Sequence, residues 1–209
     1  MYDDITGIIL SGGKSKRMGV NKAMLKIGNE MLIERTCNLM SGLFRKVLLI
    51  TNTPEEYRFL RLETFEDIYK NVGPLAGIHS GLFHSLTDKS FFIACDMPFV
   101  NKELIEFIID YKTDKLITIP KAEGGTQQLC GVFSKSILND IERIIKENLK
   151  INSEQEFRKN ISFKVQLLFQ NINTEIIDIE AKFDKYKKGM FFNVNQKEDL
   201  EEAVKRLNG

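Results

Sequence analysis

Residues 6–22 read TGIILSGGKSKRMGVNK, a short apolar strand that runs directly into a glycine-rich loop. The apolar and β-branched residues from Thr6 to Leu10 indicate an interior strand that is buried on both faces. Gly12 and Gly13 lack Cβ atoms, so the backbone after this strand can fold tightly and point consecutive N–H groups at phosphate oxygens. The stretch therefore predicts a strand followed by a loop that holds the phosphates of a nucleoside triphosphate.

The same loop is cationic and has four basic side chains: Lys14, Lys16, Arg17 and Lys22. A triphosphate carries roughly three to four negative charges at neutral pH, which amides and cations together can neutralise. The loop does not fit GxxxxGK[ST], because five residues separate Gly13 from Gly19 and Val20 follows, and GxGxxG is also missing. Taken alone, the loop is also compatible with a solvated basic turn after a strand.

The composition is that of an ordinary globular chain. Its 209 residues are 43% hydrophobic and 10% aromatic, which is enough for a substantial core, and we expect one domain over residues 1–209. Thirty basic residues face 29 acidic ones, so no net field favours nucleic acid or an anionic membrane, and we expect neither as a partner.

The cysteines and the hydropathy pattern indicate the compartment. Cys37, Cys95 and Cys130 are odd in number and match no metal-ligand spacing, so we expect reduced and mostly buried thiols. We find no signal-peptide pattern and no apolar run of the eighteen or so residues that a membrane span needs. The expected location is the cytoplasm.

Strand and helix patterns alternate along the chain. Apolar runs predict strands over residues 6–10, 46–51, 90–95, 116–120, 129–133 and 174–180, and an edge segment over 190–195. Helical spacing predicts helices over residues 29–43, 55–65, 78–86, 102–111, 136–149, 163–169 and 197–207. This alternation predicts a Rossmann-like α/β fold, a doubly wound and mostly parallel sheet with helices on both faces.

Polar residues follow several of the predicted strands where each strand ends. The glycine loop follows the first strand, Asn52 the second, and Asp96 the strand at 90–95. In open parallel sheets, ligands bind beyond the carboxyl ends of the strands. Phosphate substrates usually bring Mg²⁺, which one or two carboxylates can hold, so we expect Asp96 to be a metal ligand. A helix cap or turn before Pro98 is the alternative role for Asp96.

The loop VGPLAG, residues 72–77, combines two glycines and a proline without charge. Such a backbone can let a flat base or a phosphate come close, although a plain turn is a serious alternative. Asp67 lies just upstream and either belongs to the surface or accepts hydrogen bonds from a ring N–H and an exocyclic amine of a base. His79 and His84 follow the loop, and we expect a structural role for both.

Four segments together resemble the molybdenum cofactor guanylyltransferases: LSGGKSKRMGVNK, GPLAGIHSGL, ACDMPF and FNVNQKEDL, in this order. They span nearly the whole chain. The first segment alone is similar to the broad nucleotidyltransferase family, whereas SGG, GPLAG and FNVN point more narrowly. The resemblance implies a fold like that of the nucleotide-diphospho-sugar transferases. It also implies transfer of GMP from GTP to the phosphate of the molybdenum–molybdopterin cofactor, with release of pyrophosphate.

The resemblance also implies roles for individual residues. For the nucleotide, it implies contacts from Leu10, Ser11, Gly12, Gly13, Lys22, Asn52, Asp67 and Asp96. For the reaction we expect Arg17, Lys22 and Asp96 to act, with Mg²⁺ on Asp96, and for the acceptor the resemblance implies Asn193 and Asn195. Transient contacts with molybdenum-insertion proteins and acceptor molybdoenzymes are the protein partners that we expect.

Four residues depart from the family pattern. Asn21 stands where an aspartate commonly precedes the lysine, Gln128 replaces a proline, and Gln196 and Lys197 replace Thr-Pro.

We expect direct in-line transfer without a covalent enzyme intermediate. The phosphate nucleophile is already ionised, so it needs no general base. The alternatives are a cytidylyltransferase or sugar-phosphate nucleotidyltransferase of the same fold and a non-catalytic nucleotide- or cofactor-binding protein.

Overall fold

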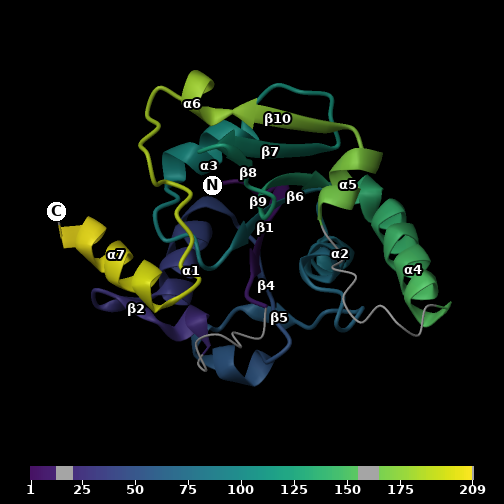
Figure 1. Cartoon of the computed structure of the whole chain (residues 1–209), viewed down its shortest axis with the longest axis horizontal. Coiled ribbons are helices and arrows are strands. Elements are labelled where there is room, and N and C mark those ends of the chain that lie inside the picture. Colours follow the sequence, from purple (N-terminus) through teal and green to yellow (C-terminus); the bar gives the residue numbers. More distant parts are fainter. Residues whose placement is uncertain (13–20, 155–164, 209) are drawn as a thin grey trace.

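The computed structural model describes residues 1–12, 21–154 and 165–208, and Figure 1 shows their arrangement. An eight-stranded sheet has the order β10-β7-β9-β6-β1-β4-β5, and β8 pairs with β7. The strands are β1 (Ile5–Leu10), β4 (Val47–Ile50), β5 (Glu63–Phe65), β6 (Lys89–Ala94), β7 (Ile117–Ala122), β8 (Gly125–Thr126), β9 (Cys130–Ser134) and β10 (Thr174–Asp178).

The centre of the sheet is parallel, as the sequence predicts. Strand β1 pairs in parallel with both β4 and β6, β4 pairs in parallel with β5, and β7 with β10. Strand β9 runs antiparallel to β6 and β7. The register places Leu10 opposite Ile50 and Ala94, so β1, β4 and β6 end at the same edge of the sheet.

Helices cover both faces of the sheet, which confirms the doubly wound arrangement (Figure 1). On one face lie α1 (Leu32–Leu43), α3 (Lys102–Ile109) and α6 (Ile179–Lys182), and on the other lie α2 (Pro74–His84), α4 (Leu138–Glu154) and α5 (Gln166–Asn171). Successive side chains of a strand point to opposite faces. Accordingly, Ile9 belongs to the core beneath α1, and Ile8 to the core beneath α2.

A third, smaller core lies at the C-terminal helix. Helix α7 (Lys197–Asn208) contacts a hairpin formed by β2 (Lys26–Ile27) and β3 (Glu30–Met31). Ile27, Val194 and Ala203 are buried between them. This packing brings the C-terminal segment back to the first quarter of the chain.

The prediction of a helix over residues 55–65 is wrong. A 3₁₀ helix, η2 (Pro54–Leu60), ends at Arg61, which has a left-handed backbone with φ of 54°, and strand β5 follows. Residues 62–65, in which apolar Leu62 and Phe65 flank polar Glu63 and Thr64, fit a strand as well as a helix, and pairing with β4 decides between them.

The segment 190–195 is not an edge strand, which corrects a second prediction. The strand order ends instead at β10 on one side and at β5 on the other. The predicted helix at 78–86 begins earlier, at Pro74, because proline fits the first turn and Gly73 before it has a positive φ of 79°. Within the described ranges, no helix combines the length and the apolar character that a membrane span requires.

Candidate functional site

The carboxyl ends of β1, β4 and β6 lie side by side at one edge of the sheet. The Ser11 N–H donates to the carbonyl of Ile50 at 2.9 Å, and the Cys95 N–H donates to the carbonyl of Leu10 at 3.1 Å. The residues just beyond β1, β4 and β6 are therefore tied together by the backbone. Asp96 follows Cys95 directly, which places its carboxylate at this edge.

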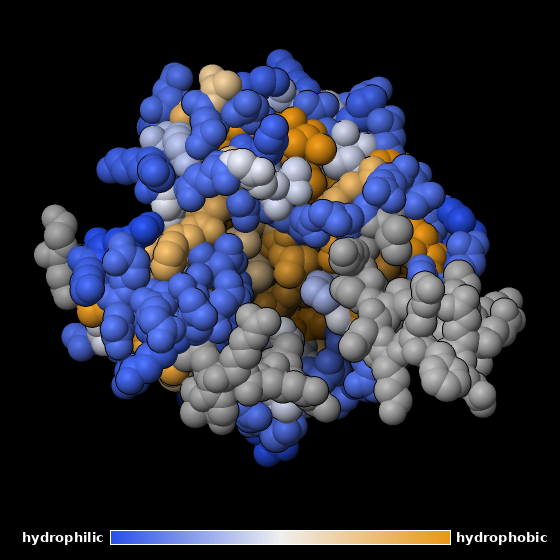
Figure 2. Space-filling model, in the orientation of Figure 1, coloured by the Kyte–Doolittle hydropathy of each residue, from blue (hydrophilic) through white to orange (hydrophobic). Residues whose placement is uncertain are grey.

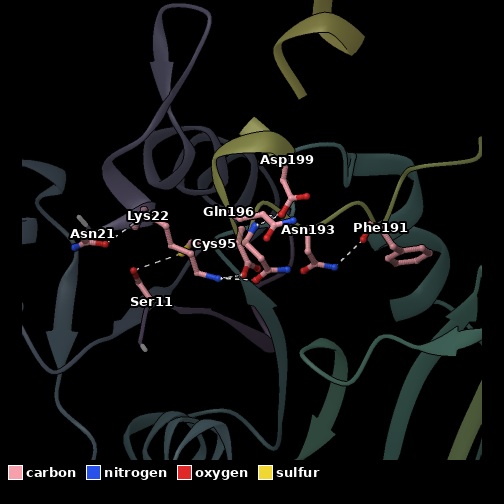
Figure 3. Close-up of polar contacts among 11 residues, drawn as sticks. Ser11, Asn21, Lys22, Cys95, Phe191, Asn193, Gln196 and Asp199 are labelled. Atoms are coloured by element: carbon pink, nitrogen blue, oxygen red, sulfur yellow. Dashed lines mark hydrogen bonds and ion pairs between the residues drawn. The ribbon is translucent and has the colours of Figure 1, made fainter. Parts of the chain in front are cut away.

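Lys22, Asp96 and Asn195 form the inner cluster of the site. Lys22 Nζ lies 2.5 Å from Asp96 Oδ2 and 3.1 Å from Asn195 Oδ1. Figure 3 shows the Lys22 side chain reaching from its own short helix, η1 (Lys22–Met24), toward the C-terminal segment that carries Asn193 and Gln196. An ammonium group has three hydrogens, so one remains for a ligand beyond these two bonds to described residues.

One of the two carboxylate oxygens of Asp96 makes no hydrogen bond to the described residues. Its side chain is only 14% exposed, and Oδ1 is buried with no hydrogen-bond partner among the described residues. A buried carboxylate oxygen without a partner loses the hydration it would have in water. The buried position of this oxygen therefore favours a ligand that pairs with it.

The C-terminal segment is attached to Asp96 through the backbone. The Val194 N–H donates to the Asp96 carbonyl at 2.9 Å. Asp199 Oδ2 accepts from the N–H groups of Asn195 and Gln196, at 2.8 and 2.9 Å, and so caps α7. The Asn193 amide donates to the Phe191 carbonyl within its own turn. Of the two predicted acceptor residues, the described contacts therefore bring Asn195, and not Asn193, to the inner cluster.

A second, outer cluster consists of Asn52, Asp67 and Lys70. Asn52 Nδ2 donates to Asp67 Oδ2 at 2.6 Å, and Asn52 Oδ1 accepts from the Asp67 N–H at 3.2 Å and from Lys70 Nζ at 2.8 Å. Burial raises the pKa of the Asp67 carboxyl above its usual value, and the Asn52 and Lys70 contacts oppose this effect.

The N-terminal half of α2 closes over Leu10 and Asp67. A methyl group placed at Gly77 would lie 3.1 Å from Leu10 Cδ2 and 3.8 Å from Asp67 Oδ1. Glycine at this position therefore permits the close approach of the helix to both predicted nucleotide contacts. Residues 74–77 of the segment VGPLAG form the first turn of α2, so the predicted loop is confined to Val72 and Gly73.

Ser11 lies at the predicted nucleotide site, but its side chain is engaged inside the protein. Ser11 is 5% exposed, and its Oγ lies 2.7 Å from the Tyr57 hydroxyl and 3.5 Å from Cys95 Sγ. Figure 3 shows the bond between Ser11 and Cys95. The Ser11 side chain therefore binds Tyr57 and Cys95, and its N–H binds Ile50, which leaves the backbone carbonyl as the part that can serve a nucleotide.

Two predicted residues, Gly13 and Arg17, lie outside the described residues, as do Lys14 and Lys16. Gly12 is described and exposed. All three cysteines are free and buried, as predicted, and burial raises the pKa of each thiol to about 12. His84 stacks on Phe65 with ring centroids 3.8 Å apart, and His79 meets the Tyr69 ring edge-on at 4.9 Å.

The face shown in Figure 2 is hollowed near its centre. Hydrophobic residues, coloured orange, line the floor of this hollow, and hydrophilic residues surround much of it. An apolar floor with polar groups around it is the usual form of a small-molecule site.

Comparison with known proteins places the chain in a family. The model of the MobA-like NTP transferase domain matches residues 7–160. The chain belongs to this family. A probable molybdenum cofactor guanylyltransferase from Clostridium perfringens is 35% identical over 95% of both chains. Another, from Carboxydothermus hydrogenoformans, is 32% identical over 97% of this chain and 96% of its own.

Solved structures agree with the MobA-like assignment. Molybdopterin-guanine dinucleotide biosynthesis protein A from Archaeoglobus fulgidus superposes with a TM-score of 0.79 at 25% identity, over 98% of this chain and 99% of its own. A cytidylyltransferase for 2-C-methyl-D-erythritol 4-phosphate from Thermus thermophilus shares the fold, with a TM-score of 0.65 at 15% identity. The predicted fold class is therefore confirmed, and so is the prediction that the chain is a nucleotidyltransferase.

Sequence reasoning missed four residues that contact the predicted site residues: Glu56, which accepts from Asn21, and Tyr57, Lys70 and Asp199. Tyr57 lies within the segment wrongly predicted as a regular helix. Asp199 carries a recognisable signal, since an acidic residue in the first turn of a helix is typical of capping.

Proposed function

We propose that the protein transfers GMP from GTP to the terminal phosphate of the molybdenum–molybdopterin cofactor, forming the guanine dinucleotide and releasing pyrophosphate. The names of its relatives and the order of its sequence motifs support these two substrates. The observation that carries the proposal is the inner cluster, in which Lys22 and the half-free Asp96 carboxylate stand at the carboxyl ends of the central strands.

The residues present fit a bound Mg²⁺ ion. Mg²⁺ is commonly held by one or two carboxylates together with substrate phosphates and water. No cluster of three or more metal-ligating residues exists within the described ranges, and a single carboxylate with a buried, unpartnered oxygen suits this mode. Asp96 would hold the ion, which would act as a Lewis acid on the phosphate oxygens.

The reaction that we propose is an in-line displacement at the α-phosphorus of GTP. A phosphate oxygen of the acceptor forms the new P–O bond while the bond between the α-phosphorus and its bridging oxygen breaks, and pyrophosphate leaves with that oxygen. Lys22 would use its remaining N–H on a phosphate oxygen and offset the charge that develops there. Arg17, in the same loop sequence, is proposed to do the same for the leaving group.

The nucleotide and acceptor sides would meet at Asn195. We propose that Leu10, Gly12, Gly13, Asn52 and Asp67 bind GTP and that Asn193 and Asn195 bind the pterin phosphate. Because Asn195 contacts Lys22, we propose that the two sides share this residue pair. The enzyme would act in the cytoplasm, where its free cysteines stay reduced, and would contact molybdenum-insertion and acceptor proteins transiently.

Pyrophosphate release with each of the four nucleoside triphosphates, Mg²⁺ and loaded cofactor tests the proposal. Of the four nucleoside triphosphates, we expect only GTP to give pyrophosphate release. The product should have the mass of the guanine dinucleotide. A preference for CTP would support the cytidylyltransferase alternative. Binding of GTP without turnover in the presence of loaded cofactor would support a non-catalytic binding protein.

A further inference from the structure

The hydroxyl group of Tyr57 joins two segments that the chain separates by the glycine loop. Tyr57 is 2% exposed, and its hydroxyl lies 2.7 Å from Ser11 Oγ, just after β1. Asn21 Nδ2 donates to the same hydroxyl at 2.9 Å. Ser11 precedes the loop sequence and Asn21 ends it, directly before Lys22. A single buried hydroxyl thus holds both ends of this segment.

Asn21 uses its whole amide group in this arrangement. Its Oδ1 accepts from the Ala23 N–H at 3.1 Å and caps η1, the short helix that carries Lys22. Its two Nδ2 hydrogens serve Tyr57 and Glu56 Oε2, the latter at 2.7 Å. An aspartate could make the cap but has no hydrogen to donate, and its charge would face Glu56. The departure from the family pattern at this position therefore matches the presence of Glu56.

We propose that Tyr57 is a positioning residue for triphosphate binding, which acts through Asn21 on Lys22 and through Ser11 on the start of the loop. The proposal rests on the proposed function. The distances join three elements: Tyr57 on η2, Asn21 at the start of η1, and Ser11 at the end of β1. Loss of the hydroxyl leaves the ring packed but frees both partners to shift.

The test measures the binding of GTP with Mg²⁺, and of GMP, to the full chain by calorimetric titration. For Tyr57→Phe we expect GTP affinity to fall about tenfold, because two hydrogen bonds near the phosphates are lost, and GMP affinity to fall much less. Tyr2→Phe is the matched control, since the Tyr2 hydroxyl bonds Asp110 beyond the opposite end of β1. That variant should bind GTP within about twofold of the parent.

A second pair of variants keeps the proposal testable if Tyr57→Phe does not fold. Asn21→Asp should weaken GTP binding about fivefold or more, because its carboxylate faces Glu56 at hydrogen-bond distance. Adding Glu56→Gln supplies a donor to the new carboxylate and should restore most of the affinity. A purely structural role would change the melting temperature without this loss and recovery.

The outcomes separate the two proposals. If the parent protein binds no GTP, the proposed function fails. If the parent binds GTP and Tyr57→Phe binds it equally well, or if Glu56→Gln gives no recovery in the Asn21→Asp variant, Tyr57 does not position the site. Equal losses of GTP and GMP would also overturn the inference, because the effect would then not depend on the additional phosphates.

Discussion

The inner and outer clusters lie at the same edge of the sheet but are built in different ways. In the inner cluster, Lys22 meets side chains 74 and 173 residues further along the chain, and one oxygen of Asp96 is left without a partner among the described residues. The outer cluster joins residues within 18 positions of one another, and both polar atoms of the Asn52 amide are bonded. The inner cluster thus has a buried oxygen without a partner among the described residues, whereas the outer cluster has none.

This difference indicates separate duties for the two aspartates. An unpartnered, buried oxygen such as that of Asp96 gains most from a cation, while the Asp67 carboxylate already accepts a hydrogen bond from the Asn52 amide. We therefore expect chemistry to depend on Asp96 and nucleotide recognition to depend on Asp67.

Asp96→Asn should have the largest effect. The side chain keeps its size but loses the charge proposed to hold Mg²⁺, so turnover should fall about a hundredfold or more in steady-state kinetics. The same substitution at Asp67 should raise the KM for GTP and lower turnover far less. Near-normal turnover of folded Asp96→Asn would contradict the proposed role of Asp96 as the metal ligand. Equal losses of turnover in the Asp96 and Asp67 variants would contradict the proposal that the two clusters have different roles.

Lys22→Met should lower kcat/KM for GTP by about tenfold to a hundredfold, because it removes the cation placed for the phosphates. The double variant with Asp96→Asn provides the sharper measurement. Residues that act on the same transition state lose less together than the sum of their separate losses. We expect such non-additivity in free energy, and strictly additive losses would indicate that the 2.5 Å pair has no common task.

Asn195→Ala should have a smaller effect, since it removes one hydrogen bond to Lys22 Nζ. We expect a loss of about threefold to tenfold in kcat/KM for the loaded cofactor, with a smaller change for GTP. Asn193→Ala is the matched comparison, because its described contact is confined to its own turn. A loss confined to Asn193→Ala would place the acceptor on the far side of this segment from Lys22.

The sequence predicts the central layer of the fold because its strands are buried on both faces. Continuous apolar runs such as residues 47–50 have few alternatives once glycine and polar residues bound them. The same logic placed Asn52 and Asp96 at one sheet edge. It failed for residues 55–65 and 190–195, where pairing with β4 and packing against α7 decide the backbone.

The connections within the site were harder to predict. The contact between Lys22 and Asn195 depends on α7 packing against the β2–β3 hairpin, which no local pattern reports. The resemblance predicts a nucleotide contact from Ser11, yet its hydroxyl meets Tyr57 in the interior. Spacing along the chain indicates which residues gather at an edge, and tertiary packing decides which atoms they share.

Asp67→Asn should have the smallest effect, a gain in stability of the unliganded protein at neutral pH. Burial raises the pKa of the Asp67 carboxyl, so the folded state holds the charged form at a cost that the unfolded chain does not bear. The cost is fully present above the raised pKa and disappears as the pH falls through it toward the ordinary value of 3.8. Asparagine carries no such charge and can still accept from Asn52.

Thermal unfolding of parent and variant across this pH range checks the sign. The variant should melt about one or two degrees higher at pH values near 7, and the difference should shrink toward zero as the solution is acidified. Glu147→Gln is the control, because Glu147 is an exposed carboxylate paired with Arg143 outside the outer cluster, and its loss should leave stability unchanged or slightly lower. If Asp67→Asn instead lowered the melting temperature at neutral pH, the charged form of Asp67 would stabilise the fold. The outer cluster would then be a structural ion network, and its proposed role in recognising the nucleotide would lose its physical basis.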